Sequence, residues 1–233
     1  MKKYLKENYG NDKNAWLTNR GIGGTSASAI VGHNPYQTAL DIYCAIENPE
    51  QEKEETENER TIYGKLLEPL IRNNIKANFS HKYKVNSPKG FVMYRRKDKS
   101  YMTATLDGTM VSLTDKKEKW IIEIKTHDMG DSEDRAKWEN NQIPDHYLIQ
   151  CLHYLAVMND YTGCLFVAKL RYMNYETDEP YQEKIIYLKI RRSDYEQLIA
   201  DIETAETNFM ENNVKPHIPP SVSVSIMEEE NNE

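Results

Sequence analysis

The segment "LDGTMVSLTDKKEKWIIEIKT", Leu106 to Thr126, contains two apolar runs joined by a short polar stretch. β-Branched and aromatic residues are frequent in both runs, which indicates two neighbouring strands. The second run nevertheless carries Glu123 and Lys125 among its isoleucines. Side chains two positions apart on a strand point to the same face, so this hydrophobic strand places an acid and a base side by side.

The polar stretch between the runs sets their predicted register. A hairpin folded about residue 115 places Asp107 directly opposite Glu123, with Cβ atoms ~4.5–5.5 Å apart. Two facing carboxylates repel each other unless a cation lies between them, and Mg²⁺ is typically held by carboxylates, water and substrate phosphates. We therefore expect a divalent metal here, with Lys125 close enough to hold an activated water or to stabilise charge on a phosphate. A simple surface Glu–Lys pair is the alternative interpretation.

The composition is that of a globular protein with one substantial core, because 39% of the 233 residues are apolar and 29% are charged. No apolar run approaches the ~20 residues that span a bilayer, and the first residues lack the apolar region of a secretory signal. The three cysteines are scattered and form no CxxC pair, which favours a reducing compartment and argues against a zinc or iron–sulfur site. We expect a cytoplasmic protein without a membrane partner.

The net charge of −7 comes from two acidic blocks. Residues 50–59 hold six Glu against one Lys, and residues 228–233 hold four Glu. Blocks of this kind are usually solvated loops or tails. The remainder of the chain is slightly basic, so the overall acidity does not exclude an anionic substrate.

Hydrophobic periodicity predicts an α/β fold with a mixed central sheet flanked by helices. Helices are expected over residues 1–20, from about Ser26 to Gly32, over 38–47, from about Arg60 to Asn78, from Asp145 to Asn159, and from a Ser193 N-cap to about residue 212. The long helix is expected to place Leu66, Leu67, Leu70, Ile71 and Ile75 on one side. Three antiparallel strands are expected in "GFVMYR", "SYMTATLDGTMVSL" and "KWIIEIKT", and two more in "TGCLFVAKLRYM" and "QEKIIYLKI". We interpret residues 1–215 as one domain containing an acidic loop at 50–59, and residues 216–233 as an irregular acidic tail.

Several short motifs accompany the acidic pair in a fixed order. "RGIGGTSASAIVGHNPY" contains an R-x-G-I-G-G-S/T box followed by G-x-x-P-Y, and "YGKLLEPLI" contains G-x-x-x-E-P. "TATLDG" carries Asp107, and "IPDHYLIQCLHYLAVM" contains I-P-x-x-Y-x-x-Q-x-x-H-Y. Together with Asp107 and Glu123-Ile124-Lys125, these motifs resemble the YqaJ-type viral recombinase, or λ exonuclease-like, family of the PD-(D/E)xK nuclease superfamily. The resemblance covers roughly residues 15–215.

The resemblance implies a restriction-endonuclease-like core and a set of metal-site residues. Asp107 and Glu123 correspond to metal ligands, helped by the Ile124 carbonyl, and Glu68 corresponds to an acid that completes the site, often through water. Mg²⁺ is the implied cofactor, with Mn²⁺ as an alternative. Lys125 would position or deprotonate the attacking water. Gln150 would touch the scissile phosphate or that water, with Tyr154 four residues on along the same helical face.

The same resemblance implies a pocket for a 5′-phosphate. Arg20 corresponds to the arginine that receives the phosphate, and Thr105 lies where the pocket has a small hydroxyl residue. Either Ser26 or Ser28 would supply another hydroxyl. An arginine, hydroxyls and the start of a short helix suit an anion. Without the resemblance, the same segment is interpreted as a flexible turn and helix cap.

The function implied is a metal-dependent exonuclease acting on double-stranded DNA ends, with 5′→3′ digestion that leaves a 3′ single strand for phage-type recombination. A single-strand annealing protein and a ring-shaped homotrimer are the implied partners. An endonuclease on the same core is one alternative, and a catalytically silent DNA- or protein-binding descendant is another.

Three further residues have more than one interpretation. His153 is expected to be packed or hydrogen-bonded beside the site. His127 follows Thr126 and could approach DNA. Trp138 lies in a polar segment that forms either one wall of a DNA channel or a solvated loop with one anchored aromatic.

Overall fold

The computed structural model describes residues 2–49, 58–130, 132–140, 142–173 and 181–221. The helices are α1 (Lys13–Thr18), α2 (Gly24–Ile30), α3 (Ala39–Glu47), α4 (Glu59–Phe79), α5 (Ser132–Glu139), α6 (Asp145–Val157) and α7 (Glu196–Phe209). The strands are β1 (Tyr4–Asn8), β2 (Tyr83–Asn86), β3 (Val92–Arg96), β4 (Thr103–Ala104), β5 (Gly108–Ser112), β6 (Lys119–Asp128), β7 (Gly163–Met173) and β8 (Tyr181–Arg191). A 3₁₀ turn, Arg192–Asp194, precedes α7, and a π-helical turn, Met210–Val214, follows it.

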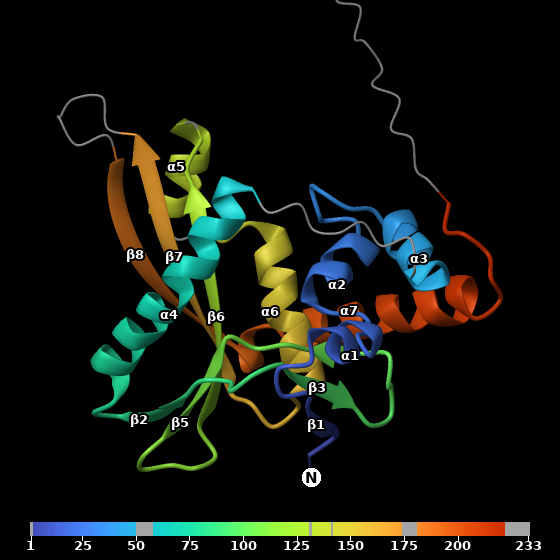
Figure 1. Ribbon diagram of the computed structural model, residues 1–233, viewed down its shortest axis with the longest axis horizontal. Helices are drawn as coiled ribbons and strands as arrows, with labels where there is room; N and C mark the ends of the chain where they lie inside the picture. The colour runs from blue at the N-terminus through green and yellow to red at the C-terminus, as the bar shows by residue number, and fades with distance from the viewer. Residues whose placement is uncertain (1, 50–57, 131, 141, 174–180, 222–233) are drawn as a thin grey trace, which may run out of the picture.

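A five-stranded mixed sheet in the order β2-β5-β6-β7-β8 forms the centre of the molecule (Figure 1). β6 and β7 are parallel, and the other neighbouring pairs are antiparallel. The parallel pair requires a long crossover, which α5 and α6 supply. The predicted α/β class with a mixed sheet between helices is therefore confirmed.

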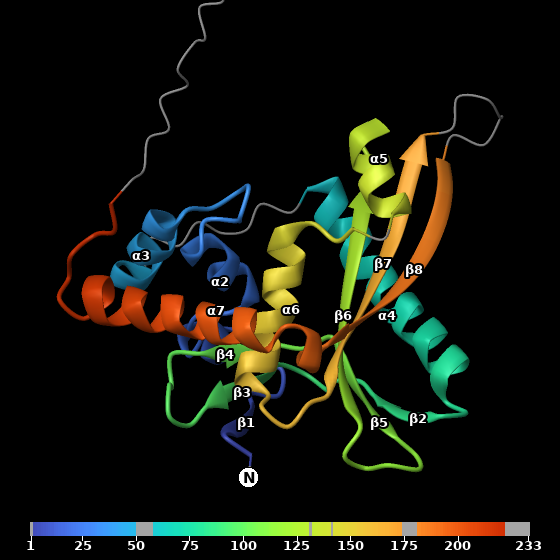
Figure 2. The same ribbon diagram turned by 180° about the vertical axis from the view of Figure 1, so that it is seen from behind.

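Helices cover both faces of this sheet and create two apolar cores. On one face, α4 packs Ile71 and Ile75 against the Trp120, Ile122 and Ile124 side of β6. On the other face, α6 packs onto the side that carries Ile121 of β6 and Phe166 of β7. α7 and α2 lie against α6 on that side, as the view from behind shows (Figure 2). β6 is thus covered on both faces, which explains its near-continuous apolar sequence.

A second, three-stranded sheet in the order β1-β3-β4 packs beside the central one. This sheet corrects two predictions. The polar helix expected over residues 1–20 is wrong, because Tyr4–Asn8 forms a strand that pairs with β3 and only Lys13–Thr18 is helical. The stretch "SYMTATLDGTMVSL" is not one strand, since β4 belongs to the small sheet and β5 to the central sheet. The turn from one sheet to the other lies at residues 105–107.

The predicted helix at 38–47 and those that begin near residues 60 and 145 are confirmed within two residues. The apolar side assigned to α4 is partly wrong, because Leu66 and Leu70 are 69% and 62% exposed while Ile71 and Ile75 are buried. The Ser193 N-cap is also wrong. Ser193 lies in the 3₁₀ turn and donates to Asp194, and α7 begins after Tyr195.

The remaining predictions concern the connecting segments. Of the acidic loop predicted at 50–59, residues 50–57 lie outside the described part, whereas Asn58 caps α4 and Glu59 begins it. The acidic tail at 228–233 also lies outside the described residues. Residues 132–139 form a helix, α5, so the loop expected for this segment is wrong there, whereas Trp138 is buried as expected for an anchored aromatic. Within the described residues, none of the helices combines the length and apolar character that a membrane crossing requires.

Candidate active site

The β5–β6 hairpin has the register predicted from its turn. Gly108 pairs with Ile122 and Thr109 with Ile121. Continuing this register by one residue brings Asp107, which immediately precedes β5, opposite Glu123. The two residues are also linked through the backbone, because the Ile124 amide donates to Asp107 Oδ2 at 2.7 Å. This bond holds the Asp107 carboxylate against β6, at the residue that follows Glu123.

Glu123 is buried, with 2% of its surface exposed, and α6 supplies part of its environment. Gln150 Nε2 donates to Glu123 Oε1 at 2.7 Å and to the Tyr154 hydroxyl at 2.9 Å. Lys125 Nζ lies 2.7 Å from the same Oε1. The structure therefore brings together five of the residues that the sequence singled out: Asp107, Glu123, Lys125, Gln150 and Tyr154.

Removal from water raises the pKa of both carboxyls in this cluster. The pKa of Asp107 rises well above its usual range through burial, with further contributions from the negative charges of Glu123 and Glu68. Burial also raises the pKa of Glu123, although Lys125 counteracts this effect. The pair is consequently a site of unfavourable negative potential that a cation would relieve.

Lys125 stays cationic despite its enclosed position. Burial alone would lower its pKa, but the charges of Glu123 and Asp107 raise the pKa above the usual lysine value. Its ammonium also lies 5.3 Å from the centre of the Tyr147 ring, a cation–π contact from the first turns of α6. His146 is the neighbouring residue, and burial followed by the Lys125 charge lowers its pKa. The sequence interpretation missed both Tyr147 and His146 as parts of this environment.

Glu68 lies on α4 and approaches the pair from the other side. Its charge contributes to the raised pKa of both Asp107 and Glu123, so it is within electrostatic range. Arg72, one helical turn further on, forms an ion pair with Glu68. Sequence reasoning did not identify this arginine, although an i, i+4 spacing to an acid was the signal available.

The side chains at this site suit a hard divalent cation. Asp107 and Glu123 supply carboxylate oxygens, which Mg²⁺ prefers, and because burial raises the pKa of both carboxyls, a cation beside them would favour their charged forms. Within the described residues, however, no three acidic, histidine or cysteine side chains are gathered closely enough to hold a metal by themselves. The facing pair is therefore the acidic centre, and direct ligation by Glu68 or the Ile124 carbonyl stays a prediction.

The glycine-rich box packs directly against this centre. Gly24 begins α2, and a Cβ on it would lie 2.3 Å from Gln150 Cγ and 3.1 Å from Tyr154 Cε1. Only glycine allows α2 to approach α6 so closely. The preceding residues run beside β4, where Ile22 pairs with Met102 and the Gly21 amide donates to the Thr103 hydroxyl. The box is therefore a packing element as well as a candidate anion site.

The four residues predicted to hold a 5′-phosphate differ in their availability. Arg20 is exposed, and its guanidinium stacks 4.8 Å from the Trp16 ring and reaches toward Gly23. Thr105 is exposed and Ser26 is half-buried. Ser28 is buried, donates to the Thr25 carbonyl and accepts from Asn34, so its hydroxyl is committed to the fold. Between the two serines left open by the sequence, the geometry favours Ser26.

The comparisons with known proteins agree with this geometry. The family model for the YqaJ-like viral recombinase domain matches residues 15–164. The chain belongs to this family. It is 26% identical over 229 residues to the uncharacterised protein YqaJ of Bacillus subtilis (strain 168), covering 97% of the chain and 64% of the length of that relative.

The fold of this YqaJ-family chain is similar to that of a solved alkaline exonuclease. An alkaline exonuclease from Laribacter hongkongensis superposes with a TM-score of 0.60 at 15% identity, covering 88% of the chain and 94% of the exonuclease. The same exonuclease in complex with dAMP gives a TM-score of 0.54 at 14% identity, covering 87% and 91%. The family and the fold class predicted from the sequence are both confirmed.

Two histidines of the YqaJ-family chain have structural partners. His153 is fully buried, with Nδ1 2.7 Å from Glu206 Oε1 of α7 and Nε2 2.9 Å from the Thr103 carbonyl of β4. It thereby joins α6, α7 and the small sheet, as expected for a packed residue. His127 Nε2 lies 2.8 Å from Asp134, and its ring contacts Trp138, so it anchors α5 to the end of β6.

Proposed function

We propose that this protein is a metal-dependent deoxyribonuclease that digests double-stranded DNA from its ends, in the 5′→3′ direction, and leaves a 3′ single strand. The observation that carries the proposal is the cluster formed by Asp107, Glu123 and Lys125 on the edge of a buried hairpin, with Gln150 hydrogen-bonded to Glu123. Membership of the YqaJ-like family and the exonuclease fold support the same conclusion.

Asp107 and Glu123 would hold Mg²⁺, with Mn²⁺ as a substitute and with Glu68 and the Ile124 carbonyl as further donors. The bound ion would acidify a water and neutralise charge on the scissile phosphodiester. Lys125 Nζ lies beside Glu123 Oε1, so it would orient the attacking water or take its proton, and its charge would stabilise negative charge on the phosphate.

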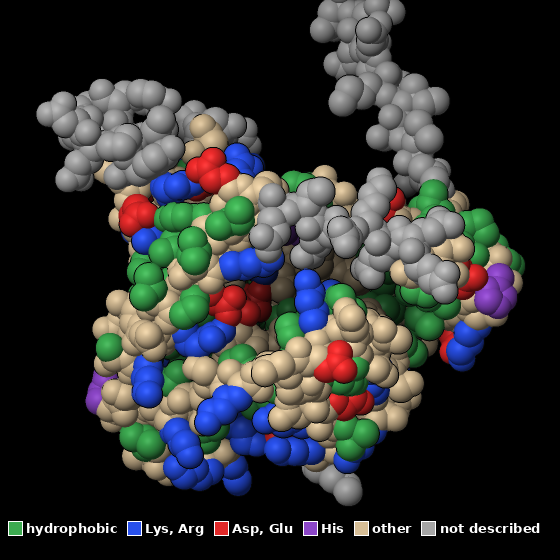
Figure 3. Space-filling view, viewed as in Figure 1, with side chains coloured by type: hydrophobic (Ala, Val, Ile, Leu, Met, Phe, Trp, Pro, Cys, Tyr) green, Lys and Arg blue, Asp and Glu red, His purple; other side chains and the backbone are tan. Residues whose placement is uncertain are grey.

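Gln150 and Tyr154 would position the acidic pair. Gln150 holds one carboxylate oxygen of Glu123, and Tyr154 holds Gln150, so the Glu123 rotamer is determined by α6. A carboxylate fixed in this way needs little reorganisation when substrate arrives. Figure 3 shows acidic side chains beside a hollow between α4 and α2, with Lys and Arg side chains around them, and positive charge around an acidic site suits a polyanion.

Selection of a DNA end would fall to the glycine-rich box. Within the described residues, Arg20 has no carboxylate partner, and Gly24 joins this box to Gln150. A 5′-phosphate held by Arg20, Ser26 and Thr105 would fix the distance from the strand end to the acidic pair. Delivery of the 3′ strand to an annealing protein and assembly into a homotrimeric ring are part of the proposal.

The test uses linear duplex DNA labelled at either end, with and without a 5′-phosphate, in Mg²⁺, Mn²⁺ or EDTA. We expect metal-dependent release of nucleotides from phosphorylated 5′ ends, lost in Glu123→Gln and retained in Glu196→Gln, which removes an exposed carboxylate on α7. An Arg20→Gln variant should lose the preference for phosphorylated ends.

Two results would replace this proposal. Cleavage of covalently closed circles at a rate similar to that on linear DNA would indicate an endonuclease. Binding of DNA without cleavage in any metal would indicate a silent binding protein. Light scattering of the protein without DNA tests the trimer, which predicts three times the mass of one chain.

A further inference from the structure

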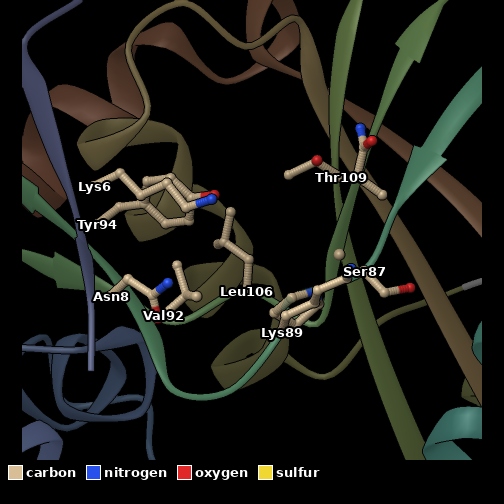
Figure 4. A pocket seen from close by; sticks show the side chains of 11 residues that line it. Lys6, Asn8, Ser87, Lys89, Val92, Tyr94, Leu106 and Thr109 are labelled. Atoms are coloured by element: carbon tan, nitrogen blue, oxygen red, sulfur yellow. The ribbon is translucent and has the colours of Figure 1, made fainter. Parts of the chain in front are cut away.

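A cavity of 470 Å³ lies between the two sheets, on a part of the surface that the proposed catalytic steps do not use. Lys6 and Tyr94, from the small sheet, line one side, and Thr109 of β5 lines the other. Figure 4 shows the side chains of Lys6 and Tyr94 running side by side into the space from the small sheet. Leu106 and Gly108, which flank Asp107 in the chain, also line the cavity. The cavity therefore adjoins the catalytic hairpin.

The rim of the cavity carries uncompensated positive charge. Lys6 of β1 and Lys89 of the β2–β3 connection are both exposed, and neither has an ion pair within the described part of the chain. Lys and Arg side chains also gather over the neighbouring surface around β2, β5 and the N-terminal strand (Figure 3). Two ammonium groups on the rim of one hollow, with no ion pair among the described residues, favour a ligand with negative charge.

The interior of the cavity combines apolar and amide surfaces. Val92, Leu106 and the Tyr94 ring provide apolar and aromatic contact area. Asn8 of β1 and Asn86 of β2 add amides. Asn8 Oδ1 accepts from the Gly10 amide and Asn86 Nδ2 donates to the Lys84 carbonyl, so the groups they offer a ligand are the Asn8 Nδ2 donor and the Asn86 Oδ1 acceptor. A flat aromatic base gains from apolar and aromatic contacts, amides pair with its polar edge, and lysines hold a phosphate. The volume also lies in the range of small-molecule sites, roughly 300–1,000 Å³.

We propose that this cavity binds one nucleotide, with its base between Tyr94 and Leu106 and its phosphate at Lys6 and Lys89. The proposal rests on the proposed nuclease function for its class of ligand, because digestion of DNA produces both free nucleoside monophosphates and a single strand. The shared chemistry is a nucleotide with a phosphate. A nucleotide held here would lie beside Asp107 but outside the acidic pair, which leaves the pair free for the next phosphodiester.

The test measures the binding of dAMP and of a short oligodeoxyadenylate by calorimetry in EDTA, so that no metal holds a phosphate at the acidic pair. The variant Lys6→Gln/Lys89→Gln removes both rim charges. Its matched control, Lys84→Gln/Lys117→Gln, removes two exposed lysines of β2 and the β5–β6 turn that do not line the cavity. We expect the cavity variant to bind about tenfold more weakly or worse, since tenfold corresponds to the loss of about one charge-assisted contact, and the control to change less than about twofold.

A third variant tests the site by shape. Ser87 is exposed in the β2–β3 connection and lines the cavity, so Ser87→Trp should fill the cavity and abolish binding without removing charge. Saturable binding of dAMP would identify the released product as the ligand, and binding of the oligonucleotide alone would identify the single strand. Either result supports the site when Lys6→Gln/Lys89→Gln and Ser87→Trp lose that binding.

Two results would overturn the inference: no binding of either probe, or binding that Lys6→Gln/Lys89→Gln and Ser87→Trp leave unchanged. The nuclease assay on duplex DNA separates this failure from that of the proposed function. A protein that digests DNA but binds no nucleotide in the cavity contradicts only this inference. A protein that binds the probes in EDTA but cuts no DNA in any metal contradicts only the nuclease proposal.

Discussion

The two faces of β6 are both covered by helices, yet they carry different chemistry. Trp120, Ile122 and Ile124 face α4 and form an apolar core. Glu123 and Lys125 share the opposite face with Ile121, and their contacts are charged or polar. One face stabilises the fold through burial of apolar surface. The other face holds the Glu123 carboxyl beside that of Asp107, and both have raised pKa values. This pair contributes little to stability, and a bound cation would reduce the repulsion between the two carboxylates.

The largest expected difference between the faces concerns activity. Glu123→Gln should reduce the rate of DNA cleavage about 10³-fold or more, because it removes one of two carboxylates that would hold the metal. The free energy of unfolding without metal should change little, since Asp107 still compensates Lys125 and the glutamine can accept the same hydrogen bonds. Cleavage rates and chemical denaturation of one preparation measure both effects. A large loss of stability with a normal rate would reverse the assignment of this face.

Ile122→Ala tests the opposite face one residue away. Truncation of a fully buried isoleucine should lower the free energy of unfolding by about 2–5 kcal/mol. The cleavage rate per folded molecule should stay within about threefold, because Ile122 faces away from the acidic pair. Denaturation curves combined with rates corrected for the folded fraction check this. A rate loss comparable to that of Glu123→Gln would remove the distinction between the faces.

Much of this arrangement could be predicted from sequence because it is local. The position of the turn between β5 and β6 determines their register, so the proximity of Asp107 and Glu123 followed from counting residues. The errors have two causes. β1 has too few apolar residues to resemble a strand and forms only because β3 pairs with it. Leu66 and Leu70 have helical spacing, but the direction in which α4 packs is decided by tertiary contacts.

Among contacts between segments far apart in the chain, the family resemblance brought Gln150 to the acidic pair, but other such contacts were not predicted. The approach of Gly24 to Gln150 depends on how α2 and α6 dock together. Glu68, which pairs with Arg72, raises the pKa of Asp107 only because α4 docks on the central sheet close to it. The glycine box suggested an anion site, but its packing against α6 has no signal in the local pattern. The choice between Ser26 and Ser28 also needed the fold, because only burial distinguishes them.

A smaller effect is expected where the glycine box supports the charged face. Gly24→Ala would place a Cβ 2.3 Å from Gln150 Cγ, so it should displace Gln150 from Glu123 and lower the cleavage rate about 10-fold or more. Overpacking should also reduce the free energy of unfolding by about 1–3 kcal/mol. The control is Gly23→Ala, whose Cβ would lie 3.9 Å from Arg20 Nη2 and meet nothing closer. Equal rates in the two variants would show that Gln150 does not position the acid.

The smallest expected effect concerns His153, near the C-terminal end of α6. Burial lowers the pKa of His153, but the charge of Glu206 and its hydrogen bond to the ring outweigh this, so the pKa is raised. A raised folded-state pKa adds stability that is complete below the unfolded value of about 6.5 and disappears as the pH rises through the folded value. The stability advantage of wild type over His153→Gln should therefore shrink with increasing pH, by about 1.4 kcal/mol for each pH unit that separates the folded and unfolded pKa values. Denaturation across this pH range measures it. An advantage that grows with pH would contradict a charged His153.

The most direct test of the account is the position of a bound metal. Crystals grown with Mn²⁺ should give an anomalous peak between the carboxylates of Asp107 and Glu123, and the peak should be absent in crystals of Glu123→Gln. A peak elsewhere on the molecule, or cleavage of DNA by a protein whose Asp107–Glu123 pair binds no Mn²⁺, would contradict the assignment of this face of β6 as a nuclease centre.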